Sequence, residues 1–548
     1  MRAGVALLLS MIFIAVFSAL AVSMATMSGA NVQLASNQHK INAALSAAQS
    51  ALECGKYIVA NTTLPSTSIN IVTTEEANNA WNSLCSQVQG QPWVAGRASP
   101  TENAIITPAV NFGQANTSFQ VKFHRSDTHT IKLEGIGSDG QITRGVSINM
   151  KITKDNEVLN YAIASRGRMW ITGDSTIHGD VFSAWNLSKS QLATLATNPS
   201  ALATMTAPNI SPFNLTSDSE VLGTINTCWS KEQIKNKTWQ LETLDEQGEP
   251  MYDENGNKII SPEDEIQGYN EGINYGVPPQ NIPGTEIADY DTTIYYNKTR
   301  TANDGNGDIT TSGTTRTEYF PHGVNSDGTN NYQKSVSGSL TLTRHVYTGQ
   351  TFTNVRLKAS DNALFQNCTF DGVLFVDCSG NVATGVGTSK YNNVRFDNCT
   401  FNGTIVTNTP QTFNWQKNCL YYSGSATFQN NTSSEATILA PHFNVNLGNT
   451  NPVSGTENVL RGAIIGGIVD VRGNAEVFGT IISMADTSMY TSGYVTNIGA
   501  TLDDGGSETV AIGDIGVINI TPDPDKLLPS GITSPIIIKP LQNTYCEG

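Results

Sequence analysis

The segment Ile171-Thr172-Gly173-Asp174-Ser175-Thr176-Ile177-His178-Gly179-Asp180-Val181-Phe182-Ser183 has a counterpart three hundred residues later in the same chain. It aligns without a gap to Val471-Arg472-Gly473-Asn474-Ala475-Glu476-Val477-Phe478-Gly479-Thr480-Ile481-Ile482-Ser483. Both segments have glycine at the third and ninth positions and an apolar residue at the seventh. Self-similarity of this kind indicates one structural unit that the chain uses twice.

The second half of this unit, an apolar-x-Gly-x-apolar-apolar motif, recurs around Gly372, Gly403 and Gly462. The run Asn-Cys-Thr-Phe also occurs twice, at 367–370 and at 398–401, an offset of 31 residues. A fixed motif at variable, coil-sized intervals is typical of a solenoid whose loops differ in length.

We therefore predict a parallel β-helix in which each strand turns at glycine and buries its apolar side chain against the coils above and below. Its interior ladders would contain Ile177, Phe370, Phe401 and Val477. The cysteines of the repeated run, Cys368 and Cys399, would stack on successive coils as buried thiols. The rival fold, an antiparallel β-sandwich, does not readily explain the repeated glycine motif.

The N-terminus is a long apolar segment. No charged residue occurs between Arg2 and Lys40, and the only polar residues from Val5 to Ala25 are three serines. A helix of this length spans roughly 30 Å of hydrocarbon. The residues expected to contact lipid or neighbouring subunits are Val5, Leu7, Leu8, Leu9, Ile12, Phe13, Ile14, Val16, Phe17 and Leu20.

The helical pattern continues beyond the apolar segment. Ile41, Leu45, Ala48 and Leu52 form one apolar stripe at helical spacing, and no proline occurs before Pro65. The sequence therefore predicts a single helix from Val5 to about residue 58. Three interpretations remain open: a secretory signal cleaved near Ala25, a permanent membrane anchor, or a filament-forming stem.

The run Arg2-x-Gly4-Val5-Ala6-Leu7-Leu8, with Ala51-Leu52-Glu53 near the end of the helix, resembles type IV pilin-like proteins. The closer similarity is to PilX-type minor pilins and to the K-type pseudopilins of type II secretion. The resemblance implies that a prepilin peptidase cuts after Gly4 and that the helix starting at Val5 packs into a filament with other pilin-like subunits. Major pilins carry glutamate where this chain has Leu9, which fits a minor subunit.

The resemblance covers about the first 60 residues and part of the next 100. In the second part, the runs 119–123, 131–133 and 146–150 alternate apolar and polar residues, which predicts an antiparallel sheet packed on the C-terminal half of the stem. Residues 135–140, with three glycines, are expected to form a hairpin turn.

The chain of 548 residues is too long for one core, and we expect several domains. The expected divisions are 1–28 leader and hydrophobic stem, 29–60 projecting amphipathic helix, 61–155 small pilin-like β domain, 156–185 first β-helix coils, 186–335 proline-rich acidic insertion, 336–510 β-helix and 511–548 extended C-terminal strap. The net charge of -16 makes nucleic acid an improbable partner.

Few residues suggest chemistry beyond packing. Cys54 and Cys85 are predicted to form a disulfide in an exported protein. Asp304, Asn306 and Asp308 begin like a calcium loop, but the later ligand positions do not match, so a solvated turn is the default and no cofactor is expected.

Catalysis is not expected either. Asp174 and Asp180 are the nearest candidate acids for polysaccharide hydrolysis, and their counterparts in the second repeat are neutral. The sequence favours a non-enzymatic bacterial surface protein, single-pass near its N-terminus, with its bulk periplasmic or extracellular. It would display an adhesive or structural β-helix, with surface glycans as a candidate ligand class. The alternative is a secreted or anchored carbohydrate-active β-helix.

Overall fold

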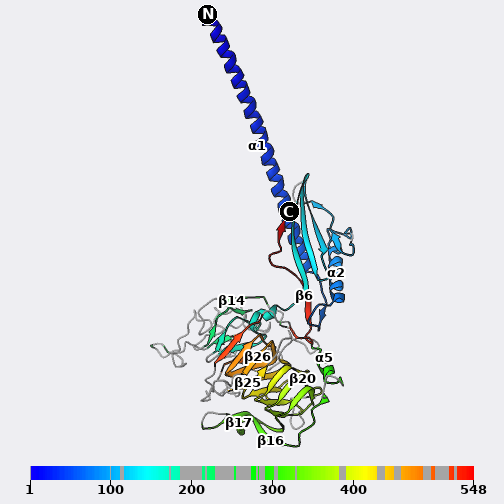
Figure 1. Ribbon diagram of the computed structural model, residues 1–548, viewed down its shortest axis with the longest axis vertical. Coiled ribbons are helices and arrows are strands. Elements are labelled where there is room, and N and C mark those ends of the chain that lie inside the picture. The colour runs from blue at the N-terminus through cyan, green and yellow to red at the C-terminus, as the bar shows by residue number, and fades with distance from the viewer. Residues whose placement is uncertain are drawn as a thin grey trace. The chain divides into compact units, whose positions relative to one another are not determined.

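The computed structural model describes residues 2–98, 100–111, 116–171, 175–185, 213–215, 219–228, 252, 254, 273–278, 282, 290–301, 307–326, 330–381, 390–428, 438–449, 458–484, 495–499, 517–523 and 528–548. The chain divides into two compact units. The stem unit comprises residues 1–66, 71–154 and 535–548, and the solenoid unit comprises 67–70 and 155–534. The predicted fold class is confirmed: a long N-terminal helix, a small antiparallel sheet and a large parallel sheet (Figure 1).

The stem unit is built on one helix, α1 (Arg2–Ala60), which ends close to the predicted position. Its small residues Ala44, Ala47, Ala48 and Ala51 are at most 1% exposed. The second helix, α2 (Thr74–Gln89), starts with a capping box between Thr73 and Glu76. Both helices contribute to a single hydrophobic core.

The sheet of the stem unit has the order β1-β32-β6-β5-β4-β2, with β3 beside β4 and β33 beside β6. The bounds are β1 (Ser66–Thr67), β2 (Ala104–Ile106), β3 (Val110–Asn111), β4 (Thr117–Arg125), β5 (Thr130–Asp139), β6 (Ile142–Lys154), β32 (Ser534–Pro540) and β33 (Cys546–Glu547). The pairs β4–β5, β5–β6 and β6–β32 are antiparallel, as predicted for the first three of these strands.

Two glycines of β5 allow α1 to lie directly against the strand. A Cβ added at Gly135 would lie 2.2 Å from the carbonyl oxygen of Ala48, and one at Gly137 would lie 2.0 Å from that of Ala44. The prediction of a turn over 135–140 is therefore wrong for Gly135 and Gly137, which lie within β5. Because glycine has no side chain, these two residues let α1 pack closely against the strand. The reversal lies at Gly140, whose φ is 63°.

The solenoid unit contains the remaining strands in one 25-stranded sheet, with the short helices η1 (Glu157–Asn160) and α5 (Thr293–Lys298). The strands are β7 (Tyr161–Ser165), β8 (Arg168–Ile171), β9 (Ser175–Ile177), β10 (Asp180–Ser183), β11 (Phe213–Leu215), β12 (Glu220–Val221), β13 (Ile225–Thr227), β14 (Ile273–Tyr275), β15 (Gly307–Asp308), β16 (Thr315–Val324), β17 (Asn330–Thr348), β18 (Thr351–Leu357), β19 (Ala363–Gln366), β20 (Thr369–Val376), β21 (Asn393–Asp397), β22 (Thr400–Thr407), β23 (Cys419–Ser423), β24 (Thr427–Phe428), β25 (Ile438–Asn449), β26 (Asn458–Arg461), β27 (Ile464–Gly473), β28 (Ala475–Phe478), β29 (Ile481–Ser483), β30 (Val495–Ile498) and β31 (Ile518–Thr521). The coil strands pair in parallel, whereas β16 and β17 form an antiparallel hairpin.

The first coil of the chain lies inside the stack rather than at one end. Strands β7, β8 and β9 pair on one side with β29, β30 and β31, and on the other side with β10, β11 and β12. Val477 is in register with Ile520, and Ile520 is in register with Ile177. The two repeated segments therefore lie two coils apart, although three hundred residues separate them in the chain.

This pairing changes two of the expected domain divisions. Within 186–335, β11 to β13 pair with the first coils and β14 pairs with β13, so these residues are part of the solenoid. Within 511–548, where an extended C-terminal strap was expected, β31 completes a coil and β32 joins the stem sheet. These strands are two to seven residues long, too short for a periodic signal in the sequence.

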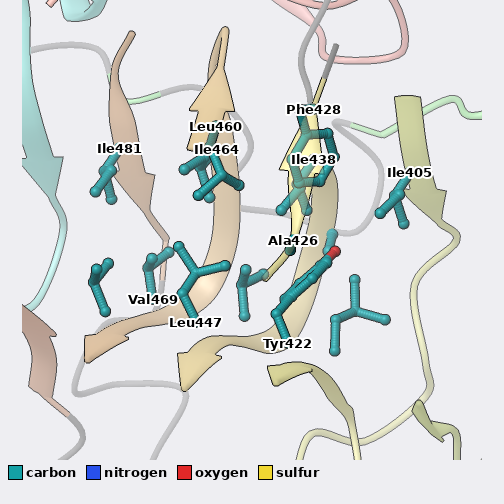
Figure 2. Packing of buried hydrophobic residues seen from close by; sticks show 14 of the residues in the cluster. Ile405, Tyr422, Ala426, Phe428, Ile438, Leu447, Leu460, Ile464, Val469 and Ile481 are labelled. Carbon is teal, nitrogen blue, oxygen red and sulfur yellow. The ribbon is translucent and has the colours of Figure 1, made fainter. Parts of the chain in front are cut away.

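Two aromatic ladders fill the interior of four successive coils. The first consists of Tyr347, Phe365, Phe396 and Tyr422, with ring centroids 4.9, 5.6 and 5.1 Å apart. The second consists of Phe352, Phe370, Phe401 and Phe428, with separations of 5.3, 5.2 and 4.6 Å. Figure 2 shows the last rungs, Tyr422 and Phe428, among aliphatic side chains from neighbouring coils. The predicted interior residues Ile177, Phe370, Phe401 and Val477 are all buried.

The corner between the two ladders is made by a residue with positive φ in every one of these coils. These residues are Gly349, Asn367, Asn398 and Gly424, with φ of 63°, 52°, 53° and 67°. Glycine and asparagine are the residues that most readily adopt this conformation. The repeated Asn-Cys-Thr-Phe run therefore marks a corner followed by an inward-pointing aromatic residue.

The motif glycines have a second role, which is to let neighbouring coils approach closely. A Cβ at Gly403 would lie 1.8 Å from the carbonyl oxygen of Gly372 on the preceding coil. We expect Gly403→Ala to lower the free energy of unfolding of the solenoid by about 3 kcal/mol, because backbone must move to relieve the overlap. Urea denaturation would measure this. Gly313→Ala is the matched control, since a Cβ there meets no atom within 4 Å, and an equal loss in both variants would contradict the explanation.

Candidate functional site: the exposed apolar segment of helix α1

The N-terminal part of α1 presents apolar side chains that the rest of the described chain does not cover. The ten residues between Val5 and Leu20 that are expected to contact lipid or other subunits are between 49% and 67% exposed. The exposed apolar series continues to Leu34, which is 71% exposed. An exposed apolar surface of this size marks a membrane or protein interaction site.

The helix is long enough and apolar enough to cross a membrane. Its most apolar window has a mean hydropathy of 2.8 and is not buried at all. Burial begins near Ala44, where the helix reaches β5. Helix α1 thus combines an uncovered apolar half with a half that is fixed to the stem sheet.

The predicted processing site lies in the first turns of α1. Gly4 is surrounded by open space, since a Cβ added there would meet no atom within 4 Å, and Val5 is 64% exposed. Leu9 is 53% exposed. Cleavage after Gly4 stays a prediction.

The two cysteines expected to form a disulfide are both free thiols in the structure. Cys85 lies on the buried face of α2, and Cys54 on α1 packs against the same core. Burial raises the pKa of Cys85 to about 11, so this thiol is protonated at neutral pH. The two elements do share a core as expected, but the predicted bridge between them is not formed in this structure.

Of the three residues with a calcium-loop pattern, Asp304 and Asn306 lie outside the described residues. Asp308 in β15 is surrounded by cations: Arg356 at 2.8 Å, Arg300 at 3.0 Å and Lys358 at 3.5 Å. Burial acts to raise the pKa of Asp308, but the hydrogen bonds from Arg356 and these three charges lower it below its usual value. The Asp308 carboxylate is thus part of a network of ion pairs.

A buried ionic cluster in the solenoid unit is a feature that sequence reasoning missed. Glu318 in β16 lies 2.7 Å from Arg344 Nε and accepts a hydrogen bond from Arg395 at 2.8 Å, and all three side chains are nearly inaccessible. The Arg395 guanidinium also lies 3.2 Å from the centroid of the Tyr332 ring. This cluster connects the β16–β17 hairpin to coil strand β21. No local pattern could reveal it, because Glu318 and Arg395 are far apart in the chain.

The similarity of this chain to known proteins comes from solved structures. No protein-family model and no curated protein matches the chain. Among solved structures, the competence-associated pilin ComZ from Thermus thermophilus matches with 11% sequence identity and a TM-score of 0.26, covering 82% of this chain and 88% of that chain.

Proposed function

We propose that this protein is a pilin-like minor subunit that inserts α1 into a membrane, assembles through the same helix with other pilin-like subunits, and displays the solenoid unit at the cell surface. The observation that supports this most is the division of α1. A segment of about thirty residues, most of them apolar, is uncovered, whereas the continuation of the same helix packs against the core of the stem unit.

The uncovered half of α1 gains free energy when lipid or another protein covers its apolar side chains. Burying one large aliphatic or aromatic side chain contributes about 2 kcal/mol. Val5 to Leu34 contains many such side chains, so the segment is strongly driven into lipid or against other apolar helices. A filament made of packed helices would cover the same surface after extraction from the membrane.

We propose a non-catalytic role for the solenoid unit, with adhesion or structural display as its task. Asp174 lies outside the described residues. The other candidate acid, Asp180, accepts a hydrogen bond from the backbone amide of Thr224 at 2.7 Å, which supports a structural role for this carboxylate. Leu9 in place of an acidic residue supports a minor rather than a major subunit.

The decisive experiment is mass spectrometry of the mature N-terminus from native cells. We expect the chain to start at Val5, and we expect Gly4→Val to retain the intact N-terminus because a branched side chain replaces the small residue before the cut. Gly29→Val is the matched control, since Gly29 also lies in open space on α1. A start near Thr26, or an intact Met1 in the unmodified protein, would contradict the proposal.

A further inference from the structure

The solenoid unit carries a hollow of about 340 Å³ on its surface. One wall comes from α5 and the segment leading into it and includes Tyr290, Asp291 and Tyr296. The other wall comes from the end of β20 and the residues after it and includes Phe375, Asp377 and Ser379. Its volume lies at the lower end of the range for small-molecule sites.

The aromatic side chains of the hollow are fixed in place. Phe375 is 2% exposed, and the Tyr296 ring meets it edge to face at 5.5 Å. The hydroxyl of Tyr290 donates a hydrogen bond to Met484 Sδ, and its backbone pairs with Ile532. Rigid rings with a polar tip offer an apolar contact surface at low entropic cost.

The polar groups of the second wall are organised around Asp377. Its carboxylate accepts hydrogen bonds from the Ser379 amide and hydroxyl, from Asn408 Nδ2 and from Arg356. Burial acts to raise the pKa of Asp377, but these hydrogen bonds and the Arg356 charge keep it below its usual value. Asp377 therefore orients the Ser379 hydroxyl, whose oxygen can still accept a hydrogen bond.

The first wall supplies an accessible carboxylate. One oxygen of Asp291 accepts a hydrogen bond from the Thr293 amide at 3.1 Å, and the residue is exposed. The Asp291 carboxylate and the Ser379 hydroxyl oxygen line the same hollow, and each can accept a hydrogen bond from a hydroxyl group of one ligand.

Ion pairs connect the hollow to its surroundings. Asp377 in the hollow is paired with Arg356, which is also paired with Asp308, and Asp308 is paired with Arg300 and Lys358. A charged ligand would compete with these ion pairs, whereas a neutral ligand leaves them intact. The chemistry that fits is an uncharged molecule with an apolar face and several hydroxyl groups.

We propose that this hollow binds a short segment of a neutral glycan, with the apolar edge of a sugar ring beside the Tyr290 and Tyr296 side chains and sugar hydroxyls bonded to Asp291 and Ser379. This inference rests on the proposed function, because it names the ligand class that the displayed solenoid would recognise.

The test uses the full chain in a detergent without a sugar headgroup. Saturation-transfer NMR and calorimetry would be run with lactose, maltotriose, cellotriose and diacetylchitobiose, and with sialyllactose as a charged counterpart. We expect at least one neutral sugar to bind, and Thr293→Trp, which places an indole on the rim, to weaken it about tenfold or more. Ser379→Ala should weaken the same sugar without altering the fold.

Ile294→Trp is the matched control, because Ile294 is the next residue of α5, is 45% exposed and does not line the hollow. It should keep the affinity within about twofold of the unmodified protein. Binding by none of the sugars, equal effects of the two tryptophans, or preference for sialyllactose would overturn the inference. The mature N-terminus is measured separately, so sugar binding by a chain that starts near Thr26 would contradict the filament role and leave the glycan site standing.

Discussion

Phe401→Ala will lower the free energy of unfolding of the solenoid unit by about 3 to 5 kcal/mol. Phe401 is 1% exposed and stacks with Phe370 at 5.2 Å and with Phe428 at 4.6 Å, so truncation opens a cavity in the middle of a ladder. Urea denaturation of the full chain would measure the loss, and hydrogen exchange in β20 and β22 would locate it.

Phe478→Ala is the matched control for this prediction. Phe478 lies in the same unit but faces outward, with the Arg461 guanidinium 4.6 Å from its ring centroid. We expect its replacement to cost about 1 kcal/mol or less. If both alanine variants lost the same stability, the ladder would not be the dominant source of cohesion between these coils.

Gly137→Val will displace α1 from the stem sheet. The added Cβ would lie 2.0 Å from the carbonyl oxygen of Ala44 and 2.3 Å from the amide nitrogen of Ala48, and helix backbone cannot yield without moving as a whole. We expect a loss of about 3 kcal/mol in the stability of the stem unit. Hydrogen exchange should show faster opening of α1 from Ala44 onward.

The control for this variant is Gly145→Ala in the neighbouring strand β6. A Cβ there would meet its nearest atoms only at 4.0 Å, so we expect little change in stability or exchange. Unchanged protection of α1 in Gly137→Val would show that the helix does not depend on this close contact with β5.

The parts of the fold that the sequence predicts are those that repeat or run for many residues. The glycine motif predicted the β-helix and its interior residues, and the apolar run predicted α1 almost to its last residue. Gly135 and Gly137 were misassigned because glycine serves both turns and close backbone contacts, and the sequence does not distinguish these uses. The pairing of β7 with β29 could not be predicted, since contacts between coils so distant in the chain leave no local pattern.

The candidate functional residues also include some that the sequence predicts and others that it does not. The exposed apolar face of α1 could be predicted from hydropathy alone, because composition determines it. The hollow beside Tyr296 could not, since it combines residues near 290 with residues near 377 that only the coil order brings together. The cluster of Glu318, Arg344 and Arg395 could not be predicted for a further reason. Charged residues are normally exposed, and only the structure shows that these three are paired and buried.

The pairing of β6 with β32 determines how residues 155–534 of the solenoid unit are attached to the stem sheet. Its chain leaves the stem sheet from β6 and returns in β32, and these two strands are neighbours, with Lys154 opposite Ile536 and Met150 opposite Pro540. Residues 155–534 of the solenoid unit thus form a closed loop on two adjacent tethers, the ends of β6 and β32. Tension on a bound ligand would be shared between both tethers. A single proteolytic cut within the loop would leave one fragment joined covalently through β6 and the other held by the pairing of β32 and β33 with that strand.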